Sequence, residues 1–253
     1  MQKKVSIVGF GNVGRALAAY FHNSGIAVQH IFLRDGAEVP KGFDFSFRYL
    51  SEVKDNSDVD LIIVCVGDRQ INEVIEQLPS EITVAYTSGS IGLKDLQRKE
   101  NIGVFYPLQT FSGNPVQDMR TVPILLESNS DEVLSCLRAF GEKLFDRVET
   151  ADSDTRGELH IAAVFVNNFT NHLYYLAEEY TRKEGIDFQL LLPLIKETAA
   201  KLNHTSPYDA QTGPARRGDD IVLSKHISRL EGIQKELYEL FSTSIKKTYE
   251  KKL

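Results

Sequence analysis

The chain has 253 residues, of which 42% are hydrophobic, enough apolar content for one large domain or two modest ones. Its formal net charge is −6, which argues against a nucleic-acid partner because phosphate binding calls for a basic face. The two cysteines exclude a disulfide framework, no apolar run approaches the roughly 20 residues that span a bilayer, and the first residues lack a signal-peptide core. We therefore expect a soluble, cytoplasmic protein with no nucleic-acid partner and no membrane partner.

The first half of the chain alternates short apolar strands with helical patterns. This alternation predicts βαβ units and an α/β domain with a doubly wound, mostly parallel sheet. The run at 60–66 is continuously apolar, as expected of a strand buried on both faces. The predicted strands cover 4–8, 28–33, 60–66, 83–86, 103–106, 122–127 and 146–149, and the predicted helices cover 14–24, 69–77 and 131–143. We expect this dinucleotide-binding domain to occupy residues 1–150.

The pattern becomes helical after residue 150. A helix is predicted from Thr155 to Glu184, because no glycine or proline follows Gly157 until Gly185, in the C-cap position. Pro193 should kink the next helix or mark its start. The remaining predicted elements are helices at 188–202, 219–230 and 233–249 and a Pro/Gly-rich loop at 203–218. We expect an all-helical domain of residues 151–253, and apolar residues spread around its first helix favour a homodimer through this domain.

A glycine-rich turn follows the first predicted strand. Its sequence is Gly9-Phe10-Gly11-Asn12-Val13-Gly14, and a helix begins directly after it, which is the context that the dinucleotide-binding motif requires. We expect Gly9 to make the tight turn, Gly11 to let the backbone approach the pyrophosphate and Gly14 to allow close helix–strand packing. The helix N-terminus would offer its N–H groups to the phosphates. The alternative is an ordinary glycine-rich turn that binds no ligand.

The end of the second strand bears on which dinucleotide binds. Sites for NAD usually place an acidic residue about 20 positions after the motif, where it bonds the ribose hydroxyl. The chain has Arg34 there, with Asp35 next. An arginine can pair with the 2′-phosphate of NADP, so we expect NADP as the cofactor and NAD as the second choice. The alternative is that Arg34 is a solvated loop residue and Asp35 bonds the ribose.

Two further loops follow predicted strands at the same edge of the sheet, where ligands bind in such folds. Asp68, after Val66 and Gly67, either caps the following helix or helps to close the cofactor site. The segment Thr87-Ser88-Gly89-Ser90 could reach the nicotinamide or the substrate. The predicted cofactor-binding residues are Gly9, Phe10, Gly11, Asn12, Val13, Gly14, Arg34, Val66, Asp68 and Ser88.

Three segments add a resemblance to a known family. They read Tyr86-Thr87-Ser88-Gly89, Tyr106-Pro107-Leu108-Gln109-Thr110-Phe111 and Thr212-Gly213-Pro214-Ala215-Arg216-Arg217-Gly218-Asp219. With the glycine motif and the helix of His160 and Asn168, the chain resembles the Rossmann-like proteins that carry a C-terminal domain of unknown function 2520. More distantly it is similar to ketopantoate reductase, pyrroline-carboxylate reductase and prephenate dehydrogenase. The resemblance implies an NADP-dependent oxidoreductase with a Rossmann sheet and a helical, often dimeric, C-terminal domain.

This chain departs from that family at two positions. Members of the family commonly have histidine where this chain has Tyr86 and Tyr106. A tyrosine can still donate a hydrogen bond, but its ordinary pKa near 10 makes it a poorer base. The departures leave catalytic roles for the two tyrosines doubtful, and we expect Tyr106 to bind substrate.

One face of the long predicted helix carries polar side chains. His160, Val164, Asn168 and His172 are spaced four residues apart, so an α-helix would place them together. A histidine suits acid–base work at neutral pH, and an asparagine could bond a substrate oxygen. We predict that His160 and Asn168 are catalytic. The alternative is a polar stripe that makes interdomain or dimer hydrogen bonds.

Paired arginines lie in the loop before a later helix. Arg216 and Arg217 follow Gly213 and Pro214, and a pair of this kind can hold a carboxylate or phosphate, so we predict that Arg217 binds substrate. Asp219 should cap the helix. The alternative for the arginines is interdomain salt bridges.

The sequence therefore predicts an NADP-dependent oxidoreductase that transfers a hydride to or from a small polar, anionic metabolite. A non-catalytic dinucleotide-binding sensor or scaffold is the alternative from another class, and a deazaflavin-linked oxidoreductase is a third.

Overall fold

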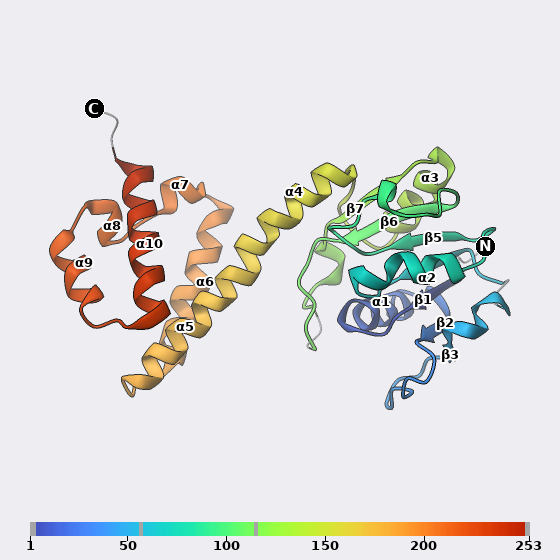
Figure 1. Cartoon of the computed structure of the whole chain (residues 1–253), viewed down its shortest axis with the longest axis horizontal. Coiled ribbons are helices and arrows are strands. Elements are labelled where there is room, and N and C mark those ends of the chain that lie inside the picture. Colours follow the sequence, from blue (N-terminus) through green and yellow to red (C-terminus); the bar gives the residue numbers. More distant parts are fainter. Residues whose placement is uncertain (1–3, 56–57, 114–115, 251–253) are drawn as a thin grey trace. The chain divides into compact units, whose positions relative to one another are not determined.

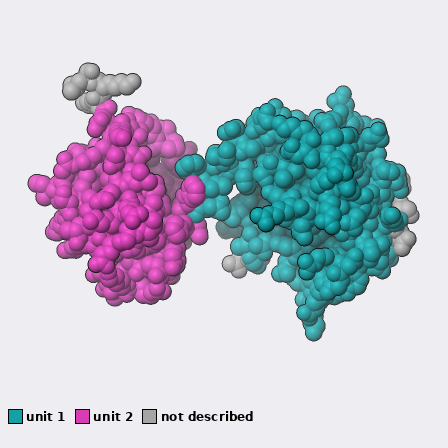
Figure 2. Space-filling view, viewed as in Figure 1, with its two compact units in different colours: residues 1–168 teal, residues 169–253 magenta. Residues whose placement is uncertain are grey.

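The computed structural model describes residues 4–55, 58–113 and 116–250 (Figure 1). The chain divides into two compact units, residues 1–168 and residues 169–253, which Figure 2 draws in teal and magenta. No helix in the described part of the chain combines the length and apolar character needed to cross a membrane.

A mixed sheet forms the centre of the first unit. Its order among the described residues is β3-β2-β1-β4-β5-β6-β7-β8, with only the β6–β7 pair antiparallel. The strands are β1 Lys4–Val8, β2 Ala27–Leu33, β3 Phe47–Tyr49, β4 Leu61–Val64, β5 Thr83–Tyr86, β6 Ile102–Pro107, β7 Ile124–Ser128 and β8 Val148–Thr150. The predicted doubly wound, mostly parallel sheet is confirmed. The strand order runs outward from β1 through β2 to β3 on one side, and the chain then crosses to β4 on the other side of β1. Folds of this kind bind ligands at the carboxyl ends of the strands where the order changes side, here between β1 and β4.

Helices cover both faces of this sheet. The 3₁₀ and α-helices of the unit are α1 Asn12–Asn23, η1 Leu50–Asp55, η2 Asp68–Gln70, α2 Ile71–Gln77, η3 Leu93–Asp95, η4 Met119–Thr121, α3 Asp131–Gly141 and α4 Ser153–Ala163. Leu17 and Phe21 of α1 and Phe140 of α3 join one buried cluster with Ile7, whereas Val74 of α2 joins the cluster on the other face. Successive residues of a central strand, such as Ile62 and Ile63 of β4, belong to opposite clusters because side-chain direction alternates along a strand.

Strand β3 was not predicted from the sequence. It spans Phe47–Tyr49 and pairs with β2 in parallel, Leu33 opposite Tyr49. Three residues are too few to show an alternating pattern, and the middle residue is an arginine. Its position at the edge of the sheet matters for the cofactor site, because its carboxyl end lies beside that of β2.

The second unit is helical in all its regular elements that the structure describes. They are α5 Thr170–Lys183, η6 Phe188–Leu191, α6 Leu192–Ala200, η7 Lys201–Asn203, α7 Pro207–Ala210, α8 Pro214–Arg217, α9 Asp220–Ile227 and α10 Gly232–Tyr249. Pro193 lies at the start of α6, so it marks a helix start and does not kink one. The predicted loop at 203–218 contains two short helices, because Pro207 and Pro214 stand at their first turns, where the missing N–H costs little.

The long helix predicted from Thr155 to Glu184 is interrupted. Residues Val164–Phe169 form a π-helical segment, η5, between α4 and α5, and the compact units divide within it. The sequence predicts a domain boundary near residue 150, where the sheet ends at Thr150. Helix α4 nevertheless groups with the sheet, because the buried Arg156 side chain ties it there.

Candidate functional site

The glycine-rich turn after β1 leaves no room for side chains at two of its positions. Gly9 has a φ of +96°, and a Cβ there would lie 2.5 Å from the carbonyl oxygen of Cys65. A Cβ on Gly14 would collide with the carbonyl oxygen of Gly9. These contacts are the physical reason for glycine at both positions, and they pack α1 tightly against β1 and β4.

The third glycine of the turn has the opposite surroundings. A Cβ on Gly11 would meet no protein atom within 4 Å, and Gly11 precedes α1 without giving it a side-chain cap. The first turn of α1 carries no acidic residue. The N–H groups at this helix start thus receive no side-chain cap and lie at the positive end of the helix dipole, a position that favours an anion. The turn fits the pyrophosphate of a dinucleotide.

The three residues between these glycines have different surroundings. The Phe10 ring is buried, 5.0 Å from the ring of Phe43 and 5.1 Å from that of Phe47, centroid to centroid. Phe10 can therefore offer a cofactor only its backbone. Val13 packs partly buried against the core, and the Asn12 amide nitrogen donates to the carbonyl oxygen of Phe111 at 3.1 Å.

Arg34 and Asp35 follow β2 directly and are both exposed. Oδ1 of Asp35 accepts two hydrogen bonds from Ser51, one from its hydroxyl at 2.8 Å and one from its backbone N–H at 3.2 Å. The carboxylate is thus engaged with the start of η1, while Arg34, directly before it, lies exposed at the carboxyl end of β2.

Three predicted residues lie on loops at the carboxyl ends of β4 and β5. Val66 lies against the glycine-rich turn, 3.0 Å from where a Gly9 Cβ would stand. Asp68 was one candidate cap of the following helix, and this capping interpretation is wrong, because the residue at the N-cap is Gly67. The Asp68 carboxylate instead accepts from the Ser90 hydroxyl and so links the two loops. The Ser88 hydroxyl is buried and accepts from the N–H groups of Ser90 and Ile91, each at 3.1 Å.

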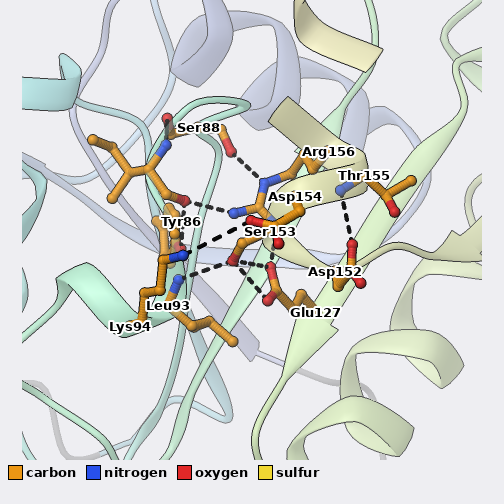
Figure 3. A network of polar contacts seen from close by, with 12 residues as sticks. Tyr86, Ser88, Leu93, Lys94, Glu127, Asp152, Ser153, Asp154, Thr155 and Arg156 are labelled. Atoms are coloured by element: carbon orange, nitrogen blue, oxygen red, sulfur yellow. Dashed lines mark hydrogen bonds and ion pairs between the residues drawn. The ribbon is translucent and has the colours of Figure 1, made fainter. Parts of the chain in front are cut away.

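A buried arginine, which the sequence analysis missed, fixes the loop after β5. Arg156 of α4 is only 1% exposed; its Nε donates to the carbonyl oxygen of Ser88 at 3.1 Å and its guanidinium pairs with the Glu127 carboxylate (Figure 3). A second guanidinium nitrogen donates to the carbonyl oxygen of Ile91. Glu127 also accepts from the Ser153 hydroxyl at 2.7 and 2.9 Å. One network therefore joins α4, β7 and the 88–91 loop.

The loop that Arg156 holds contacts an aromatic–imidazole pair. The hydroxyl of Tyr106, near the end of β6, lies 3.1 Å from Nδ1 of His160, one turn after Arg156 on α4. A Cβ on Gly89 would lie 2.8 Å from that Nδ1 and 2.8 Å from Cζ of Tyr106. Burial raises the pKa of Tyr106, and the positive charge of the nearby Arg156 opposes this rise. Glycine, phenol and imidazole thus meet at one point of the carboxyl edge.

A cavity of about 340 Å³ opens beside this pair. Tyr106 and His160 line it, together with Gln109 and Thr110 from the loop after β6. Val164, Asn167 and Asn168 of the π-helical segment line it too. Of the predicted polar face, His160, Val164 and Asn168 therefore meet at one cavity, and π-helical turns often occur at functional sites. His172 lies beyond this segment, exposed and stacked on Tyr175.

Tyr86 has a structural role, because its side chain stabilises the loop after β5. Its side chain is fully buried and its hydroxyl donates to the carbonyl oxygen of Ile91 at 2.9 Å. Burial raises the pKa of Tyr86 well above its usual value, so the phenol stays neutral. Through this hydrogen bond the Tyr86 side chain holds the end of the 88–91 loop.

The paired arginines belong to the second unit and have different surroundings. The Arg216 guanidinium stacks 4.8 Å from the centroid of the Tyr249 ring and donates to the carbonyl oxygen of Asp209 at 3.1 Å. Arg217 is exposed at the end of α8. The Asp219 side chain accepts from the N–H of Val222 at 3.2 Å, which confirms the predicted cap of α9.

Two families match consecutive parts of the chain. Residues 1–107 match the NADPH-binding domain of acetohydroxy acid isomeroreductase, and residues 122–245 match a domain of unknown function, DUF2520. No curated protein matches the chain. The first match is to an NADPH-binding domain, and the prediction of NADP as the cofactor, with NAD as the alternative, is confirmed.

Solved structures share this architecture over nearly the whole chain. The putative NADP oxidoreductase BF3122 from Bacteroides fragilis is 33% identical, with a TM-score of 0.84 over 97% of this chain and 98% of that one. Protein TM1727 from Thermotoga maritima is 19% identical, with a TM-score of 0.70 over 97% and 98%. Pyrroline carboxylate reductase from Plasmodium falciparum, with NADP bound, is 13% identical, with a TM-score of 0.63 over 99% and 100%. The last two show a shared fold.

The fold and the glycine turn define a dinucleotide-binding protein of the Rossmann type, and the family and structure comparisons support the class of NAD(P) oxidoreductases. The chain belongs to the same family as the Bacteroides fragilis protein BF3122.

Proposed function

We propose that this protein is an NADP-dependent oxidoreductase that acts in the cytoplasm on a small polar, anionic metabolite. The observation that carries the proposal is the contact of Tyr106 and His160 at 3.1 Å, beside Gly89 and at the mouth of a cavity lined by amide side chains. When bound, the dinucleotide supplies or accepts the hydride. What the protein must add is binding, orientation and a route for one proton.

The cofactor would be held along the carboxyl edge of the sheet. Gly11 and the N–H groups at the start of α1 would bind the pyrophosphate, and Arg34 would pair with the 2′-phosphate of NADP. Gly9 and Gly14 shape this turn by packing, and Val66 and Asp68 stand on the next loop of the same edge. The Ser88 hydroxyl is engaged within its own loop, so its contribution would be to position that loop.

The proton would pass through His160. Burial raises the pKa of Tyr106, so its hydroxyl stays protonated and can donate to Nδ1; in this arrangement the ring hydrogen of His160 would lie on Nε2. His160 is partly exposed and lines the cavity, so Nε2 would donate its hydrogen to a substrate oxygen or nitrogen and supply the proton of a reduction. Asn168, on the same cavity, would orient the substrate by hydrogen bonds.

Binding of an anionic group would fall to Arg217. Its neighbour Arg216 is committed to Tyr249 and to backbone oxygens, whereas Arg217 is exposed. A guanidinium can bind a carboxylate through two parallel hydrogen bonds.

We also propose a homodimer through the helical unit. Among the described residues of this unit, only Thr181, Ala215 and Leu223 are buried. Its large apolar side chains are widely exposed, Leu190 by 71% and Ile221 by 86%, and its helices enclose a largely apolar cavity of about 620 Å³. A second copy of the chain would cover surface that a lone helical unit of this size leaves in water. Sedimentation at micromolar concentration should give twice the chain mass; a monomer there would refute the dimer.

Two experiments test the function. Calorimetry of the purified protein with NADPH and NADH should show NADPH binding more tightly, and absence of binding at millimolar cofactor would refute the proposal.

The second experiment measures turnover. A panel of small carboxylic acids, imines and ketones, followed by NADPH absorbance, should contain a substrate. Turnover of that substrate should be lost in the His160→Gln variant and kept in His22→Gln, whose exposed ring lies at the far end of α1. Cofactor binding without turnover of any compound would favour a sensor or scaffold.

A further inference from the structure

The neighbouring parallel strands β2 and β3 end in register. Leu33 and Tyr49 are their last paired residues, and Asp35 and Ser51 each lie two positions beyond. The Asp35 carboxylate accepts the Ser51 hydroxyl at 2.8 Å and the Ser51 N–H at 3.2 Å through the same oxygen, Oδ1. Two donors from one residue therefore hold one oxygen of the acid toward β3.

The carboxylate that Ser51 holds belongs to Asp35, whose position in the chain resembles that of the acidic residue that bonds the ribose in NAD sites. In NAD sites, an acidic residue at the end of the second strand bonds the ribose hydroxyl, and an NADP site must avoid such a charge next to the 2′-phosphate. Asp35 lies at this strand end, directly after Arg34. A carboxylate that turned toward the ribose would attract NADH and repel NADPH.

We propose that Ser51 determines the preference for NADP by holding the Asp35 carboxylate against the start of η1, which leaves Arg34 to read the 2′-phosphate. The inference rests on the proposed function, because it assigns a specificity residue to the same cofactor site. Ser51 thus acts on the cofactor through Asp35 and is a positioning residue. Glu52 supports the arrangement, since its carboxylate accepts the N–H of Tyr49 at 2.7 Å and fixes the chain between β3 and η1.

The test compares dissociation constants for NADPH and NADH by calorimetry in four variants of the full-length protein. Ser51→Ala removes the shorter of the two bonds to Asp35, and we expect weaker NADPH binding, tighter NADH binding and a preference for NADPH reduced about tenfold. Ser51→Thr keeps a hydroxyl and should keep the preference. Ser46→Ala is the matched control, because the Ser46 hydroxyl also joins β2 to the β3 segment, at 2.9 Å from Nδ1 of His30, but before β3 begins.

The double variant Ser51→Ala/Asp35→Ala separates this idea from a direct contact. If the released carboxylate is what reduces the preference, removing it should restore the preference to within about twofold of the wild type. A preference that stays low in the double variant would show that the Ser51 hydroxyl itself contacts the phosphate, and would overturn the proposal. An unchanged preference in Ser51→Ala, or equal losses for both cofactors, would overturn it too. In each of these results the wild type still binds NADPH, whereas a wild type that binds neither cofactor refutes the proposed function itself.

Discussion

The hydroxyl of Tyr106 and Nδ1 of His160 lie 3.1 Å apart, across 54 residues of chain. Tyr106 is the penultimate residue of a buried strand and His160 lies in the last turn of a helix, so both side chains come from regular elements and not from loops. Because burial raises the pKa of Tyr106, the phenol stays protonated over a wide pH range, and we assign it as the donor to Nδ1, which would put the ring hydrogen of His160 on Nε2.

The first prediction concerns this hydrogen bond. Tyr106→Phe removes the donor to Nδ1 while it keeps the ring that fills the space. We expect a loss of turnover of about tenfold or more, because the hydrogen would no longer be held on Nε2. Nitrogen chemical shifts of a neutral His160 ring should report hydrogen on Nε2 in the wild type and a mixture of tautomers in the variant. A wild-type ring with hydrogen on Nδ1 would contradict the assignment.

The second prediction concerns Gly89. In Gly89→Ala the new methyl group would stand 2.8 Å from both Nδ1 of His160 and Cζ of Tyr106, so the rings must separate. We expect turnover to fall about tenfold or more with little change in melting temperature. Gly157→Ala is the matched control on α4: a Cβ there meets nothing within 4 Å, and alanine should stabilise the helix by about 0.5–1 kcal/mol. Equal turnover in Gly89→Ala and Gly157→Ala would show that the site does not need glycine at position 89.

The third prediction separates the two kinds of glycine in the turn after β1. Gly14→Ala should lower the melting temperature sharply, because its Cβ collides with the Gly9 carbonyl oxygen. Gly11→Ala should fold normally, since its Cβ meets no protein atom, yet bind NADPH about tenfold or more weakly. Thermal unfolding and calorimetry of both variants check this. Normal NADPH binding by Gly11→Ala would mean that the pyrophosphate lies elsewhere.

The sheet and the glycine turn could be predicted because their signals are local. An apolar run such as Leu61–Val64 and three glycines at fixed spacing depend on neighbours in the chain, and each strand end then places its loop at the same edge. Local signals also gave His160 and Asn168 as polar residues on one helix. The sequence could not predict that a π-helical segment would bring both to one cavity, because Val164–Phe169 has no composition that distinguishes it from an α-helix.

Arg156 shows why other parts of the site were missed. It stands among charged neighbours, Asp154 and Glu158, in a pattern typical of an exposed first turn of a helix. Its ion-pair partner, Glu127, lies 29 residues earlier at the end of β7, and no periodicity links the two positions. A contact made by tertiary packing between distant elements leaves no local pattern to detect.

The fourth prediction follows from the burial of this pair. Arg156→Met removes the charge and leaves Glu127 and the carbonyl oxygens of Ser88 and Ile91 without their partner. We expect the free energy of unfolding to fall by about 3–5 kcal/mol, whereas Arg147→Met, which breaks an exposed pair with Glu149, should cost about 1 kcal/mol or less. Urea denaturation measures both. Similar small losses in the two variants would mean that Arg156 contributes no more than a surface charge.

The fifth prediction concerns pH. Burial raises the pKa of the Cys65 thiol from 9.0 to about 12, so the folded protein holds this proton more tightly than the unfolded chain does. Stability from this group is fully present below pH 9 and is lost as the pH rises toward 12. Between pH 8 and pH 10 the free energy of unfolding should fall by about 1.4 kcal/mol through this group. Urea denaturation at both values should show a correspondingly smaller fall in Cys65→Ala than in the wild type. Equal falls in the wild type and Cys65→Ala would show that the Cys65 thiol ionises as readily in the folded protein as in the unfolded chain, and that β4 and the turn at Gly9 do not exclude water from it.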